Sequence, residues 1–285
     1  MKSLLSALFV FPFALALAAQ VPEPVRDIEY ATIDGHSLKL DLYLSPEKGR
    51  PLIVWVHGGA WRAGSKKEVP LQKIVTQGYS VASVDYRLST EAPFPAQIHD
   101  IKAAIRFLRA KAATYGFDSQ RIAIAGESAG GHLAALVGVT NGHKTLEGNV
   151  GDQLSQSSDV RAIVSLYGAS DLTTILPQST PHGLEVRKPA LQLLLGGQPS
   201  EKPDLAKLAS PVEHVDAHDP PLLLVHGDAD PQMPPEQSKE LAAAYEKAGL
   251  KVELEIIPGA VHGGPQFYDE TRMALIKSFL DEALR

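Results

Sequence analysis

The 285-residue sequence contains no cysteine. This absence excludes disulfide bonds and every metal site built on thiolates. Basic runs are also missing: none is longer than Lys66-Lys67, and the net charge is −6, so we do not expect a nucleic-acid partner. Aromatic residues make up only 6% of the chain, but 44% of all residues are hydrophobic. That content is typical of a globular protein with a sizeable core.

Long apolar runs are absent as well, except at the N-terminus. Lys2 precedes an almost uninterrupted apolar stretch over residues 4–17, and the tripeptide Ala-Leu-Ala at 16–18 fits a small-x-small cleavage site. The stretch is shorter than the roughly 20 residues that a membrane-spanning helix needs. We therefore expect a signal peptide over residues 1–18, a periplasmic or secreted mature protein and no stable membrane insertion after cleavage. An uncleaved anchor is the alternative.

Short apolar runs alternate with helix-like segments along the rest of the chain. Residues 51–59 and 79–88 are continuous apolar runs, typical of strands buried on both faces. Residues 95–116 have helical spacing between an initial proline and a final glycine. The alternation predicts a mostly parallel eight-stranded sheet with helices on both faces, in one α/β domain over residues 19–285. The other expected strands are 26–32 and 37–44, which form an antiparallel hairpin, and 121–126, 161–168, 221–227 and 251–259.

Two connections are longer than usual. Loops at the carboxyl ends of strands in an open α/β sheet tend to shape the site. We therefore expect the fifty-residue segment 171–220 to form part of the rim of the site. For the polar, glycine-rich segment 140–159, a place at the rim and a place elsewhere on the surface remain equally open.

The segment Gly126-Glu127-Ser128-Ala129-Gly130 has the pattern G-x-S-x-G between an expected strand and an expected helix. That context is typical of a nucleophile elbow. The two glycines allow the strained backbone of a tight strand-to-helix turn. The serine hydroxyl then lies at a helix N-terminus, near free backbone N–H groups. Ser128 is therefore the predicted nucleophile, and a chance occurrence of the pattern is the alternative.

The segment HGGAW at residues 57–61 ends an earlier strand. Acyl transfer creates an oxyanion on the substrate carbonyl, and backbone N–H groups must face it. Glycines let the backbone approach that closely. We expect Gly58 and Gly59 to supply N–H groups together with Ala129, and Ala60 is a further candidate. The histidine of this segment is expected to hold the loop by a hydrogen bond and not to act as the base.

The chain order nucleophile, acid, base selects among the ten histidines. His262 is the one histidine that follows the candidate acids Asp228 and Asp230. The acid must orient the imidazole and stabilise its charged form. Asp230 is expected to do so because it lies farther along the loop, whereas Asp228 is expected to cap the turn. Asp171 remains an alternative acid.

Together these motifs resemble those of the α/β-hydrolase esterases, in particular the feruloyl and acetyl-xylan esterase branch related to hormone-sensitive-lipase-like carboxylesterases. The similarity runs over most of the chain after about Asp27. It rests on HGGAW, DYRLSTEAPFPAQIHDIKAAIRFLR, GESAGG, HGDADPQMP and GAVHGG. The resemblance implies a triad of Ser128, Asp230 and His262 and an acyl-enzyme intermediate, with no metal or organic cofactor. The implied substrates are short-chain acyl, acetyl or feruloyl esters, either small molecules or groups linked to plant polysaccharide.

The sequence departs from hormone-sensitive-lipase-like members in two ways. Glu127 precedes the serine where aspartate is usual, and too few residues precede the first strand for a helical cap. Both departures favour the polysaccharide-esterase branch, with an open site and no large cap domain. Met233-Pro234 stands where Val-Pro is more usual. Arg87 and Asp100 are expected to form a structural pair.

Two other functions are weighed against an ester hydrolase. A serine peptidase of the prolyl-oligopeptidase type usually carries a large propeller domain, for which this chain has no room. A non-catalytic α/β-hydrolase used as a binding module typically lacks a member of the triad, whereas all three residues are present here. The sequence therefore predicts a carboxylic ester hydrolase.

Overall fold

The computed structural model describes residues 22–285, so the predicted signal peptide lies outside the described residues. Within residues 22–285, no helix combines the length and the apolar character needed to cross a membrane.

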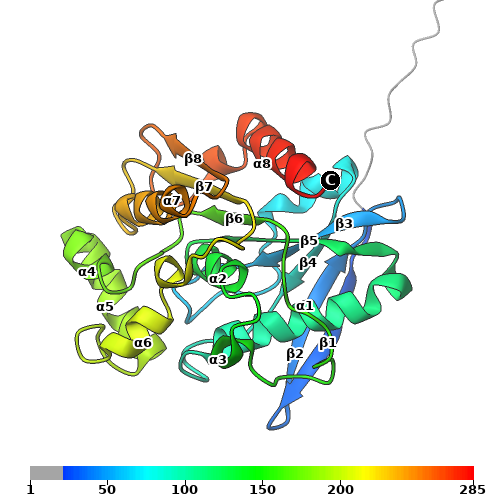
Figure 1. The fold of residues 1–285 in the computed structure, drawn as a ribbon, viewed down its shortest axis with the longest axis horizontal. Helices are drawn as coiled ribbons and strands as arrows, with labels where there is room; N and C mark the ends of the chain where they lie inside the picture. Colours follow the sequence, from blue (N-terminus) through cyan, green and yellow to red (C-terminus); the bar gives the residue numbers. More distant parts are fainter. Residues whose placement is uncertain (1–21) are drawn as a thin grey trace, which may run out of the picture.

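A single sheet of eight strands organises the described chain (Figure 1). The strands are β1 (Val25–Ile33), β2 (His36–Tyr43), β3 (Arg50–Val56), β4 (Ser80–Val84), β5 (Phe117–Glu127), β6 (Ile163–Leu166), β7 (Leu222–Gly227) and β8 (Val252–Ile257). Their order across the sheet is β1-β2-β4-β3-β5-β6-β7-β8. The pairs β1–β2 and β2–β4 are antiparallel, and every pair from β4 onward is parallel. The predicted mostly parallel sheet with an antiparallel hairpin at its edge is confirmed.

Both faces of the sheet are covered because successive side chains of a strand point to opposite faces. In β3, Leu52, Val54 and Val56 belong to one buried cluster, while Ile53 and Trp55 belong to the other. Helices α1 (Ala96–Tyr115), α2 (Ala129–Gly138) and α7 (Glu236–Ala248) complete the first cluster. The short helix η1 (Pro70–Gln77) and the C-terminal helix α8 (Glu270–Ala283) complete the second. This double cover explains the continuous apolar runs of the central strands.

The long segment 171–220 is a helical insertion between β6 and β7. It contains α4 (Ile175–Gln178), α5 (Pro181–Leu195), α6 (Pro203–Leu208) and η2 (Pro211–His214). Thr180 caps α5 by accepting a hydrogen bond from the Gly183 N–H at 3.0 Å. The apolar end of α5 packs into the first cluster, and the Phe94 N–H donates to the Leu194 carbonyl at 2.8 Å. In Figure 1, α4, α5 and α6 lie together at one side of the sheet.

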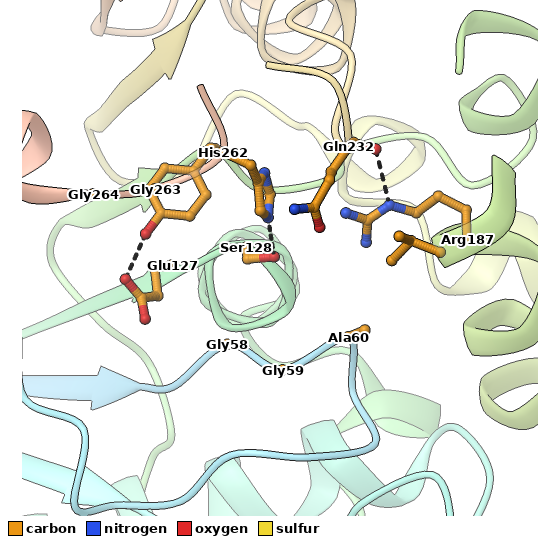
Figure 2. Close-up of a pocket in the computed structure, with 12 residues that line it drawn as sticks. Gly58, Gly59, Ala60, Glu127, Ser128, Arg187, Gln232, His262, Gly263 and Gly264 are labelled. Carbon is orange, nitrogen blue, oxygen red and sulfur yellow. Dashed lines mark hydrogen bonds between the residues drawn. The ribbon is translucent and has the colours of Figure 1, made fainter. Parts of the chain in front are cut away.

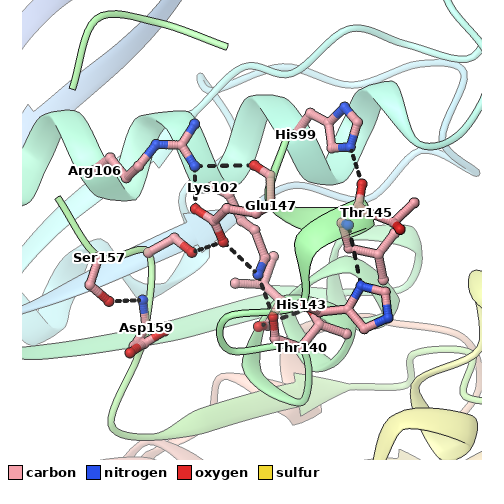
Figure 3. Close-up of polar contacts among 12 residues, drawn as sticks. His99, Lys102, Arg106, Thr140, His143, Thr145, Glu147, Ser157 and Asp159 are labelled. Atoms are coloured by element: carbon pink, nitrogen blue, oxygen red, sulfur yellow. Dashed lines mark hydrogen bonds and ion pairs between the residues drawn. The ribbon is translucent and has the colours of Figure 1, made fainter. Parts of the chain in front are cut away.

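The segment 140–159 is held along α1 by a buried polar cluster (Figure 3). Lys102 and Arg106 are buried on α1, and both pair with the carboxylate of Glu147 in the short helix α3 (Lys144–Glu147). Lys102 Nζ also donates to the Thr140 carbonyl at 2.6 Å, and Ser158 Oγ donates to Glu147 Oε2 at 2.7 Å. These contacts pair two buried cations with a carboxylate and fix the segment against the helix.

Candidate active site

Ser128 occupies the turn between β5 and α2 with φ 52° and ψ −119°. Such a conformation is strained for a residue with a side chain. A Cβ at Gly126 would lie 2.3 Å from the Gly130 carbonyl oxygen, and a Cβ at Gly130 would lie 2.1 Å from the Val56 oxygen. Only glycine fits either position, so the turn packs backbone against backbone on the end of β3. The Ser128 N–H donates to the Leu166 carbonyl at 2.8 Å, which fixes the turn on β6 as well.

Ser128, His262 and Asp230 form one hydrogen-bonded chain. Ser128 Oγ lies 2.8 Å from His262 Nε2 (Figure 2), and His262 Nδ1 lies 2.6 Å from Asp230 Oδ2. With a neutral imidazole, the serine hydroxyl donates to Nε2 while the Nδ1–H donates to the carboxylate. His262 is therefore in direct contact with both other predicted residues, although Ser128 lies 134 positions away in the sequence.

The Asp230 carboxylate is fully buried and fully engaged. Its Oδ1 accepts the backbone N–H groups of Gln232 at 2.8 Å and Met233 at 2.9 Å. Burial alone would raise the pKa of Asp230. The contacts with His226 and His262 outweigh burial and hold the pKa of this carboxyl below its usual range. Asp230 is therefore ionised at neutral pH and faces His262 as an anion.

The other two acidic candidates lie elsewhere. Asp228 Oδ1 accepts the Gly259 N–H at 2.6 Å, so this residue caps the turn after β8. Asp171 Oδ1 accepts the N–H of Thr173 at 2.7 Å and its hydroxyl at 2.6 Å. Within residues 22–285, Asp230 is the carboxylate that contacts His262.

The loop after β3 lies against Ser128. A Cβ on Gly58 would be 3.4 Å from the Ser128 Cβ, so the loop backbone approaches the serine closely. The next three residues, 59–61, all have positive φ, at 103°, 52° and 60°. A Cβ on Gly59 would meet the Ala63 carbonyl oxygen at 2.1 Å, so this position requires glycine. The loop is thus a tight, strained turn beside the serine.

Two histidines hold this loop in place by hydrogen bonds. The ring of His57 stacks on Tyr86, with centroids 4.5 Å apart, and its Nδ1 donates to the Gly58 carbonyl at 2.8 Å. Trp61 Nε1 donates to His132 Nδ1 on α2 at 3.0 Å. Burial lowers the pKa of His132 to about 4, so its ring is neutral and can accept this bond. His57 therefore has the loop-holding position expected for it.

A cavity of about 400 Å³ opens at Ser128. Its walls combine the glycine loop, the serine turn, the His262 loop and α5. The lining residues are Gly58, Gly59, Ala60, Glu127, Ser128, Tyr167, Val186, Arg187, Gln232, His262, Gly263 and Gly264. The insertion 171–220 contributes Val186 and Arg187, as its expected rim position required. No residue of the described segment 140–159 is among them, so that segment does not form the rim.

Glu127 and Arg187 are the acidic and the basic side chain among the residues that line the cavity. Glu127 Oε2 accepts the hydroxyls of both Tyr167 and Tyr268. Arg187 was not predicted from the sequence. The sequence pattern that could have indicated it is the helical spacing of the buried positions of α5, among which residue 187 is an arginine. These positions are 183, 187, 190, 191 and 194. The expected pair of Arg87 and Asp100 is present, with hydrogen bonds of 2.7 to 2.9 Å.

Comparisons with known proteins agree with this architecture. A truncated carbohydrate esterase from gut microbiota has 35% sequence identity and a TM-score of 0.82, and the match covers 92% of this chain and 96% of that one. The esterase Est2 of Thermogutta terrifontis has 28% identity and a TM-score of 0.74, with 90% and 91% covered. These structures share the α/β-hydrolase fold with this chain.

The esterase LipQ of Mycobacterium tuberculosis is 32% identical over 257 residues, which is 85% of this chain but 59% of LipQ. The chain also covers only 54% of the related esterase LipC of the same organism. This chain thus spans little more than half the length of these curated relatives. The BD-FAE family model matches residues 40–245, which is most of the chain. The fold, the site geometry and this match together show that the chain belongs to the BD-FAE family of α/β-hydrolases.

Proposed function

We propose that this protein is a carboxylic ester hydrolase that forms an acyl-enzyme intermediate on Ser128. The observation that carries the proposal is the chain of hydrogen bonds from Ser128 Oγ through His262 to Asp230, at 2.8 and 2.6 Å. His262 Nε2 takes the hydroxyl proton while Oγ attacks the ester carbonyl carbon. The ionised Asp230 stabilises the imidazolium that results. His262 then gives the proton to the leaving alcohol, and later activates the water that releases the acid.

The negative charge that develops on the carbonyl oxygen needs donors beside Ser128. We assign this role to the backbone N–H groups of Gly58, Gly59 and Ala129. The close approach of the Gly58 backbone to the serine supports the assignment. Ala129 is the first residue of α2, where backbone N–H groups have no partner within the helix. Ala60, which also lines the cavity, is a further candidate donor.

The proposed substrates are short acyl, acetyl or feruloyl esters, either as small molecules or linked to plant polysaccharide. Two similar structures support esters linked to carbohydrate. One is the gut-microbiota carbohydrate esterase. The other is a bifunctional GH43-CE protein of Bacteroides eggerthii, with 36% identity and a TM-score of 0.83, where the match covers 92% of this chain and 35% of that one. A cavity of about 400 Å³ suits a small acyl group with part of its alcohol. We further propose that the protein is exported to the periplasm or the medium after removal of residues 1–18.

An ester panel on two variants tests the activity. The wild type should hydrolyse 4-nitrophenyl acetate, and Ser128→Ala should lose about a thousandfold or more in kcat. Ser155→Ala, a serine exposed on the surface, serves as the matched control and should keep wild-type rates. Acetylated xylan and methyl ferulate in the same panel rank the substrates, and a proline-containing peptide anilide probes for peptidase activity. Retained hydrolysis in Ser128→Ala, with a wild-type circular dichroism spectrum, would sink the proposal.

A further inference from the structure

Arg187 is a buried cation in the wall of the cavity at Ser128. Its side chain is on α5 and only 1% of the residue is exposed. The guanidinium Nε donates to the Gln232 carbonyl at 3.2 Å, and Nη1 is buried without a hydrogen-bond partner. Within residues 22–285, no carboxylate lies within ion-pair distance of this guanidinium.

The other buried cations of the described chain are paired. Lys102 and Arg106 share the Glu147 carboxylate, and Lys66 Nζ lies 2.6 Å from Asp41 Oδ1. Burying an unpaired charge is costly, and native proteins normally supply a partner. Arg187 is therefore the exception among these residues, and it is the one that faces the cavity.

The charged groups near Arg187 do not form an ion pair with its guanidinium. Burial lowers the pKa of Arg187 to about 10, so the group stays protonated at neutral pH. The negative charge of Asp230 opposes this lowering, but the Asp230 oxygens are already used by His262 and two backbone N–H groups. The positive charge of Arg62 acts in the other direction. This end of the cavity is left with free guanidinium donors and a second cation nearby.

The cavity is also asymmetric in charge. In the view of Figure 2, Arg187 and Glu127 lie on opposite sides of Ser128. The Glu127 carboxylate already accepts two tyrosine hydroxyls, whereas the Arg187 donors have only one partner. The guanidinium donors without a partner therefore lie on the arginine side of Ser128.

We propose that Arg187 is a specificity-determining residue that binds a carboxylate of the ester substrate close to the scissile bond. This inference rests on the proposed ester hydrolase function. A guanidinium matches a carboxylate with parallel N–H donors, and such charge-assisted hydrogen bonds are strong in a desolvated pocket. The carboxylate belongs either to the acyl part or to the alcohol part of the ester, and the two sources are separated by experiment.

Two pairs of shape-matched esters make the test. Monoethyl succinate and ethyl 4-methylpentanoate differ by a charge in the acyl part, whereas 4-carboxyphenyl acetate and 4-isopropylphenyl acetate differ in the alcohol part. Values of kcat/KM are measured for the wild type, Arg187→Met and Arg187→Lys. Lys188→Met is the control, because this exposed neighbour on α5 loses the same charge outside the cavity.

Arg187→Met should lower kcat/KM for the charged member of one pair by about tenfold or more, and change the uncharged member by less than about threefold. The pair that responds identifies the source of the carboxylate. Arg187→Lys should recover part of the loss, and Lys188→Met should change neither member. Equal losses for charged and uncharged esters, or no loss, would overturn the proposal. Failure of the wild type to hydrolyse any of the four esters would contradict the ester hydrolase function itself.

A measurement on the wild type alone keeps the test valid if the Arg187 variants do not fold. Succinamate and succinamide, and likewise 4-hydroxybenzoate and 4-hydroxybenzamide, are compared as inhibitors of 4-nitrophenyl acetate hydrolysis. The anion of one pair should have an inhibition constant about fivefold or more below that of its amide. Equal constants within both pairs would count against the subsite.

Discussion

The ring of Tyr167 meets the ring of His262 edge-on, with centroids 4.9 Å apart and planes at 71°. Tyr167 follows β6 with a strained φ of 41°, and its hydroxyl donates to Glu127. One side chain thus touches both the proposed base and the residue before the proposed nucleophile. Its ring limits the positions that the imidazole can adopt.

Tyr167→Phe and Tyr167→Ala separate the ring from the hydroxyl. We expect Tyr167→Phe to keep kcat/KM for 4-nitrophenyl acetate within about threefold, because Tyr268 still donates to Glu127. Tyr167→Ala should lower it about tenfold or more, because the imidazole loses its packing partner. Steady-state kinetics of both variants decide this, and a large loss in Tyr167→Phe would instead give the hydroxyl the main role.

Asp230→Asn and Asp228→Asn remove the same charge at two positions of the loop after β7, but the two carboxylates have different partners. Asp230→Asn should lower kcat by about a thousandfold or more, because an amide cannot stabilise the imidazolium and favours the wrong tautomer. Asp228→Asn should have little effect on kcat, because this residue only accepts the Gly259 N–H. Equal effects of the two substitutions on kcat would refute the choice of acid.

Gly59→Ala tests the strained loop. The new Cβ would meet the Ala63 oxygen at 2.1 Å, so the loop must shift and its N–H groups leave their positions. We expect kcat to fall about a hundredfold with a smaller change in KM. Gly142→Ala is the control, since this glycine also has a positive φ, 67°, but open space around it. A similar loss of kcat in the control would attribute the effect to general instability.

Asp219 gives a prediction for stability against pH. Burial raises the pKa of Asp219 to about 6, above its value of roughly 3.9 in an unfolded chain. Between about pH 4 and pH 6 the folded state therefore binds more protons than the unfolded state, and stability falls as the pH rises. Asp219→Asn removes this loss and should stabilise the protein by roughly 1–3 kcal/mol at pH 7. At pH 4 the gain should vanish. Thermal unfolding at both values checks the sign, and an equal shift at pH 4 and pH 7 would contradict it.

The predicted signal peptide is checked by the mature N-terminus. Expression of the full chain in a bacterial host should give a periplasmic or secreted product that begins at Ala19, because the tripeptide at 16–18 fits the cleavage site. N-terminal sequencing and intact mass identify the first residue. A membrane-bound product that retains Met1 would support an uncleaved anchor.

The sheet could be predicted from the sequence because its signals are local. Continuous apolar runs mark β3 and β4, and the Asp34-Gly35 turn marks the opening hairpin. The meeting of Ser128, Asp230 and His262 also followed from sequence, because each lies just after a strand and parallel strands end at one edge. Their catalytic roles stay predictions.

The long connections could not be predicted in the same way. The helices of 171–220 are stabilised by packing on distant residues such as Phe94, and α5 even contains Pro189. The place of 140–159 depends on Glu147 meeting two cations of α1 across some forty positions. The role of Arg187 could not be predicted either. A charged residue on the buried face of a helix indicates that it has a partner, but the sequence does not identify that partner.

His132, which contacts Trp61 in the glycine loop, also contacts the insertion 171–220. His132 Nε2 lies 2.6 Å from the Ala209 carbonyl, so a single imidazole joins the loop, the helix behind the serine and the last part of the insertion. If the insertion 171–220 is exchanged between related enzymes, the contact of His132 with Ala209 therefore decides where the exchanged segment should end. A transplanted segment that ends before Ala209 keeps the recipient's own carbonyl opposite His132. A segment that includes Ala209 must place a carbonyl of its own at the same position.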